Sequence, residues 1–198
     1  MRFRGWAITG WITLGILVLN ALLLLVFGWN EEGLRVVVRS TARSSVLLFA
    51  LAFSASSLYL LRPSRTAGWL LKNRRYLGVA FAASHFVHAD ALLALATVSE
   101  RFVNEELNAV TLVGGGLAYA FIAAMAATST DRTAAWLTPR NWKRLHTVGG
   151  YWVWAIFAQS YIPRVAVEPG YAPLALLVLG ILGLRLGVRL KSRRTASA

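Results

Sequence analysis

The chain has 198 residues, of which 57% are hydrophobic and only 15% are charged, a balance typical of integral membrane proteins. It contains no cysteine, which excludes disulfides, thiolate metal sites and iron–sulfur clusters. The formal net charge is +13, but the basic residues form short clusters between apolar runs, as membrane-orientation signals do. This distribution argues against nucleic-acid binding.

The apolar runs predict an all-α integral membrane bundle, a single domain over residues 1–198 with six transmembrane helices. The first run is longer than the apolar core of a signal peptide, so we expect a retained helix. The expected spans are about 6–27, 44–61, 77–98, 110–127, 145–162 and 172–188. The segment around Pro63 is expected to end the second span, with Trp69–Leu71 lying along the surface.

Small residues in two of these spans predict close contact between helices. The second span is rich in serine, whose hydroxyl groups bond across to neighbouring helices. The fourth contains Gly114-Gly115-Gly116, which we interpret as a packing feature.

The charges between the spans predict the orientation. The N-terminus, residues 62–75, residues 131–144 and the C-terminal tail are all net basic, whereas the alternate loops hold six of the eight acidic residues. Because Lys and Arg are retained on the cytoplasmic side, both termini are expected to be cytoplasmic.

The third span carries His85, His88 and Asp90, including two of the three histidines of the chain. Ionisable side chains inside a membrane mark a functional site or a satisfied buried contact. The histidines could bond to serines of the second span or to a carbonyl of the fourth. A non-haem metal site from His85, His88 and Asp90 is a further alternative, although no fourth ligand is evident.

The segment Arg74-Arg75-Tyr76-Leu77-Gly78-Val79 leading into His88 resembles the ferric reductase-like transmembrane domain family, and most closely its MsrQ branch. Residues 42–52, Thr128-Ser129 and the segment Trp142-Lys143-Arg144-Leu145-His146 resemble other parts of that domain. The resemblance covers about residues 42–162, and the motifs agree in order and spacing.

This resemblance implies a six-helix domain with one or two b-type haems between the third and fifth helices. Electrons would pass between a cytoplasmic flavin or quinol donor and an outer acceptor, with redox subunits as partners, in a bacterial inner membrane. His88 matches the third-helix ligand and His146 the first fifth-helix ligand, whereas Gln159 stands where the second fifth-helix histidine is expected. Haem propionates or lipid phosphates are expected to contact Arg74, Arg75 and Arg144.

The depth of the histidines limits this expectation. Counted from the last basic residue before each span, His88 and His146 differ in depth by roughly 16 Å, too far to bind one iron. Three states stay open: haem on His88 alone or with Gln159, haem on His85 instead, and a protein without haem. The last would be an accessory subunit that binds lipid, pigment, quinone or neighbouring helices.

The sequence offers no self-contained enzymatic chemistry. It shows no glycine-rich phosphate loop, no nucleotide-binding domain and no nucleophile–base pair. We therefore expect at most an electron-transfer subunit, with haem b or quinone as cofactor and no flavin domain of its own.

Overall fold

The computed structural model describes residues 5–196, with side chains as far as Lys191, and this part of the chain is all helical. Arg2, Arg4, Arg193 and Arg194, which contribute to the predicted orientation, lie outside the described side chains. The all-α prediction is confirmed for the described residues. The six long helices are α1 (Trp6–Phe27), α2 (Glu31–Leu61), α3 (Arg65–Val98), α4 (Ala109–Ala127), α6 (Pro139–Tyr161) and α7 (Ala172–Ala196).

Short helices occupy three of the connections. They are a π-helical turn η1 (Phe102–Glu106), a single turn α5 (Asp131–Ala134), and two 3-10 turns, η2 (Pro163–Ala166) and η3 (Pro169–Tyr171). Five segments of the described chain are long and apolar enough to cross a membrane: Trp6–Phe27, Glu31–Leu61, Arg65–Val98, Ala109–Ala127 and Pro169–Lys191. α6 has 23 residues but is less apolar than α1 and α4.

The prediction was wrong for the N-terminal part of α2. Residues 31–43 were expected to form a loop before the second span, but they are helical. Asn30 caps this helix, and its side-chain oxygen accepts a hydrogen bond from the Gly33 amide at 3.0 Å. Glu31 lies in the first turn, where the helix dipole favours negative charge, and pairs with Arg35 at 2.9 Å. Hydropathy does not detect such a polar, well-capped helix start.

α3 also begins earlier than predicted. Ser64 follows Pro63 and caps the helix by accepting a hydrogen bond from the Ala67 amide at 3.1 Å. The expected surface segment Trp69–Leu71 therefore belongs to α3, and Leu70 is buried. Most of the predicted basic loop between the second and third spans is thus helical.

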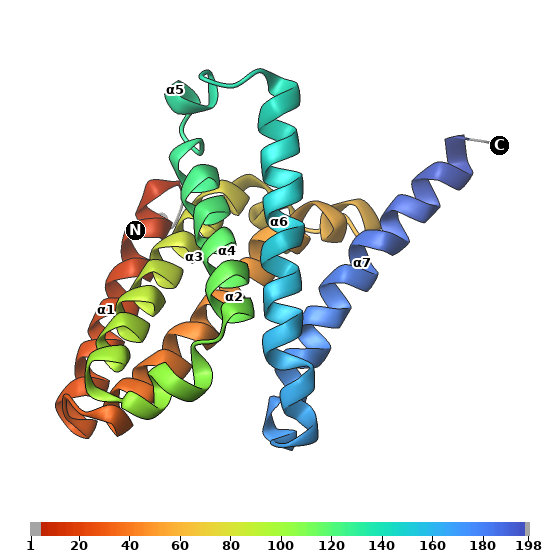
Figure 1. The fold of residues 1–198 in the computed structure, drawn as a ribbon. Coiled ribbons are helices and arrows are strands. Elements are labelled where there is room, and N and C mark those ends of the chain that lie inside the picture. The colour runs from red at the N-terminus through yellow and green to blue at the C-terminus, as the bar shows by residue number, and fades with distance from the viewer. Residues whose placement is uncertain (1–4, 197–198) are drawn as a thin grey trace.

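Figure 1 shows α1, α2, α3 and α4 grouped together, with α6 and α7 beside them; α7 diverges from α6 toward its C-terminal end. An aromatic cluster joins α2, α3 and α6 in the interior. The Phe49 ring lies 4.9 Å from that of Phe53, 5.5 Å from that of Phe81 and 5.4 Å from that of Phe157, measured between centroids. This cluster forms much of the hydrophobic core.

The close packing of α4 against α6 depends mainly on a glycine of α6, Gly149. A Cβ on Gly149 would lie 3.0 Å from the Met125 sulfur and 3.1 Å from the Phe121 ring. By contrast, a Cβ on Gly115 or Gly116 would meet nothing within 4 Å. Of the three glycines predicted to pack, only Gly114 lies against α6, where a Cβ would be 3.4 Å from the Ile156 side chain.

Candidate functional site

The His88 side chain is held by a threonine of the neighbouring helix. Its Nδ1 lies 3.0 Å from the Thr41 hydroxyl of α2, and that hydroxyl also lies 2.8 Å from the Val37 carbonyl oxygen. Because the hydroxyl donates its one proton to the carbonyl, its oxygen accepts from Nδ1–H of His88. In the neutral ring this assignment leaves Nε2 as the lone-pair nitrogen. Histidines that bind metals are oriented by a hydrogen bond of this kind from the other ring nitrogen.

His85 lies beside His88 in a more apolar setting. The two rings are 5.3 Å apart, and the His85 ring stacks on Tyr119 of α4 at 4.8 Å. Phe157 of α6 packs edge-on against His85 at 5.8 Å. Within the described part of the chain, both Nδ1 of His85 and the Tyr119 hydroxyl are buried without a hydrogen-bond partner. Buried polar groups are rarely left unpaired, so this pair is the least satisfied part of the α3–α4 contact.

Two serines of α2, Ser44 and Ser45, bond across to α3, as the packing interpretation predicts for them. The Ser84 hydroxyl lies 2.9 Å from the hydroxyl groups of both Ser44 and Ser45. His88 contacts a threonine and not these serines, and Nδ1 of His85 has no partner among the described residues. α2 and α3 are therefore joined by a row of hydroxyl contacts that ends at His88.

His146 lies near the N-terminal end of α6, in a separate network. Its ring stacks on Trp142 at 4.1 Å, and its Nε2 lies 3.3 Å from the Thr128 hydroxyl. The Trp142 indole donates to the Thr128 carbonyl oxygen at 3.0 Å. These contacts tie the C-terminal end of α4 to α6 and account for the position of His146 without a ligand.

The predicted arginines occupy the same end of the bundle. Arg74 donates to the Ser56 hydroxyl at 2.7 Å, and Arg75 pairs with Asp131 at 2.7 Å. The second contact places the start of α3 beside the α4–α6 connection. Arg144 is exposed.

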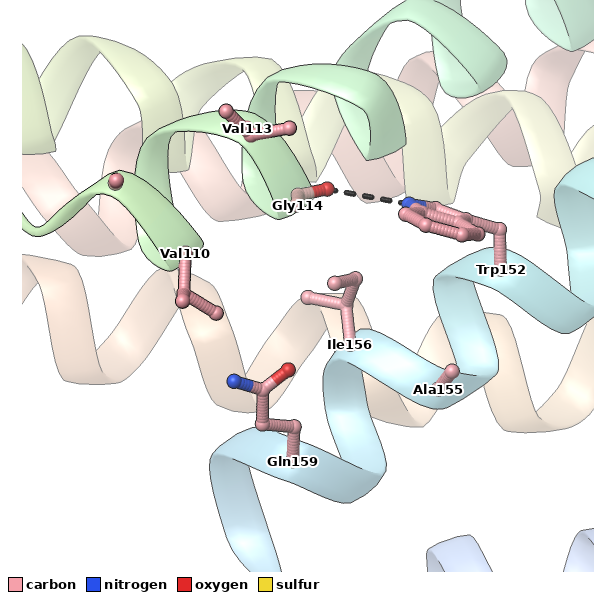
Figure 2. A pocket seen from close by; sticks show the side chains of 8 residues that line it. Val110, Val113, Gly114, Trp152, Ala155, Ile156 and Gln159 are labelled. Carbon is pink, nitrogen blue, oxygen red and sulfur yellow. Dashed lines mark hydrogen bonds between the residues drawn. The ribbon is translucent and has the colours of Figure 1, made fainter.

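Gln159 lies apart from the histidines, on a depression of about 430 Å³ between α4 and α6. Figure 2 shows its amide beside Val110 and Ile156, while the Trp152 indole donates to the Gly114 carbonyl oxygen at 3.1 Å. The depression is lined by Ala109, Val110, Val113, Gly114, Trp152, Ala155, Ile156 and Gln159. The structure thus brings His85 and His88 together, but it places His146 and Gln159 elsewhere.

The non-haem metal alternative is wrong for the part of the chain that the structure describes, because no group of three or more potential ligand residues is arranged to hold an ion there. Asp90 is exposed and forms no ion pair among these residues. Arg101 pairs with Glu105 at 2.9 Å, which raises the pKa of Arg101.

Sequence reasoning missed Arg185, which lies inside the predicted sixth span. Its guanidinium group donates to the Phe53 carbonyl oxygen at 2.8 Å and lies over the rings of Phe53 and Tyr151 at 3.9 Å and 5.3 Å. The signal was available, because a cation within an apolar run requires a buried partner. The roles of Thr41 and Tyr119 had no comparable signal.

No family model, curated protein or solved structure matches the chain.

Proposed function

We propose that this protein is a membrane electron-transfer subunit of the ferric reductase-like class, related to the MsrQ branch. It relays electrons across a bacterial inner membrane between partner proteins or from quinol. The observation that carries the proposal is the orientation of His88 by Thr41, with the Nε2 lone pair left available.

His88 is the residue that would hold the iron of a b-type haem. His88 supplies a neutral imidazole, and Thr41 fixes its tautomer and its ring orientation. Such a haem would supply one-electron redox chemistry. His146 contacts Thr128 at the rim of the bundle, and Gln159 lies on the α4–α6 depression, so both lie apart from His88.

The proposed topology has six spanning helices, with α6 as the fifth, and both termini in the cytoplasm. The Arg75–Asp131 pair supports it, because it brings together two basic segments that the charge pattern assigns to the cytoplasmic side. A single-chain relay of this kind requires a donor and an acceptor on opposite sides of the membrane.

The visible spectrum of the purified protein tests this proposal. We expect a Soret band with reducible α and β bands, which His88→Ala abolishes. His146→Ala, the matched control, should retain them, because His146 lies apart from His88 and contacts Trp142 and Thr128. Equal spectra for His88→Ala and the wild type would refute the assignment of His88.

A second candidate function is a haem-free accessory subunit that binds lipid, pigment, quinone or neighbouring helices. The aromatic packing favours it, because Phe157 contacts both His85 and Phe49 and so fills the α3–α6 interface. If the protein is folded but colourless after expression with ample haem, the electron-transfer function is excluded and the accessory-subunit function remains.

A further inference from the structure

We propose a binding site for a phosphate group at the α6–α7 turn, formed by Arg43, Arg164 and Tyr161. The site lies at the end of the bundle opposite to the Arg75–Asp131 pair, since α6 runs from one end to the other. It involves neither histidine of α3 and does not depend on the electron-transfer proposal.

Two arginines from different elements converge on one tyrosine. The guanidinium carbons of Arg43 in α2 and Arg164 in η2 lie 5.9 Å and 5.5 Å from the centre of the Tyr171 ring. Arg164 also donates to the Tyr171 hydroxyl at 3.5 Å. The ring positions both cations, while both arginine side chains stay exposed and accessible to a ligand.

No carboxylate neutralises these two cations in the part of the chain that the structure describes. The ion pairs there use Arg35, Arg75 and Arg101. Glu168 follows Arg164 within one turn, yet it forms no ion pair with it. Two like charges at one tyrosine ring, without an ion-paired carboxylate among the described residues, favour the binding of an anion.

The Tyr161 hydroxyl provides a separate indication of a ligand. Tyr161 is only 4% exposed, and its hydroxyl has no hydrogen-bond partner among the described residues. Its ring lies 6.0 Å from that of Tyr171, the ring against which both Arg43 and Arg164 lie. A buried donor without a partner, beside two unneutralised cations, is suited to an anionic oxygen.

The chemistry selects phosphate as the ligand class. Guanidinium groups bind phosphate oxygens through paired hydrogen bonds, and a tyrosine hydroxyl adds one more donor. The phosphate belongs either to a lipid headgroup, because the site lies at the end of membrane-spanning helices, or to a small soluble molecule. Both sources present the same oxygens to the site.

Binding is measured on the full chain in nanodiscs, by native mass spectrometry and by the thermal unfolding midpoint. One arm compares phosphatidylglycerol with phosphatidylcholine; the other titrates inorganic phosphate into phosphatidylcholine nanodiscs. Retention of phosphatidylglycerol identifies a headgroup site, and a midpoint that rises with inorganic phosphate identifies a soluble ligand. The absence of both effects overturns the proposal.

Substitutions of single arginines test whether Arg43 and Arg164 bind the phosphate group. We expect Arg43→Gln and Arg164→Gln each to weaken binding about tenfold, as expected for the loss of a charge-assisted hydrogen bond. Arg39→Gln, which removes an exposed charge one turn away on α2, should bind as the wild type does. Equal binding by all three variants overturns the proposal.

Tyr161→Phe separates a ligand contact from a structural role. It should weaken binding while raising the unfolding midpoint of the ligand-free protein, because it removes an unpaired buried hydroxyl. Unchanged binding by Tyr161→Phe contradicts the assigned role of this hydroxyl.

Discussion

Arg185 binds Phe53 twice: it donates to the Phe53 carbonyl oxygen at 2.8 Å, and its guanidinium carbon lies 3.9 Å from the centre of the Phe53 ring. The two contacts join α7 to α2 and offset the cost of placing a cation inside an apolar segment. α7 diverges from α6 toward its C-terminal end (Figure 1).

We therefore expect Arg185→Met to lower the free energy of unfolding by about 2 kcal/mol, since a charge-assisted hydrogen bond and a cation–π contact are lost. The measurement is the thermal unfolding midpoint in a mild detergent. Leu186→Ala, at the neighbouring exposed position, is the control and should change the midpoint little. If both substitutions lower the unfolding midpoint equally, the contacts of Arg185 with Phe53 do not stabilise the packing of α7 on α2.

Thr41→Val should destabilise the protein by about 1–2 kcal/mol, because Nδ1 of His88 loses its hydrogen-bond partner. Thr41→Ser restores a hydroxyl at the same position and should recover most of the loss. The check is the unfolding midpoint of both variants. If Thr41→Ser is no more stable than Thr41→Val, the hydroxyl does not hold the imidazole.

The glycines of α4 and α6 should respond differently to alanine. Gly149→Ala is expected to cost about 1–3 kcal/mol, because its Cβ would press against Met125 and Phe121. Gly116→Ala should be neutral or stabilising by up to about 1 kcal/mol, since the site is open and alanine favours helix. The thermal unfolding midpoints of the two variants are measured in the same detergent. A lower midpoint for Gly116→Ala than for Gly149→Ala would contradict the observed α4–α6 contact.

The absence of native cysteine allows a direct test of orientation. Asn104→Cys and Arg140→Cys place single thiols at exposed positions on opposite ends of the bundle. With both termini cytoplasmic, a membrane-impermeant maleimide should label Asn104→Cys in intact cells and Arg140→Cys only after permeabilisation. Labelling of Arg140→Cys in intact cells would reverse the proposed topology.

Much of the helical framework follows from hydropathy. The predicted first and fourth spans lie within one residue of α1 and α4, because an apolar run long enough to cross a membrane must be helical to satisfy its backbone. The extensions of α2 and α3 were missed, since their starts are polar and depend on caps at Asn30 and Ser64. Capping residues are visible in a sequence, but hydropathy gives them no weight.

The sequence fixes which residues can do chemistry inside this protein: His85 and His88 stand in an apolar span, whatever surrounds them. It does not determine which side chains contact these two histidines. The partnership of His88 with Thr41, the stacking of His85 on Tyr119 and the separation of Gln159 from both depend on the rotation and offset of whole helices. Those are set by packing between residues far apart along the chain, such as Phe49 and Phe157, and a pattern read along one segment contains no information about them.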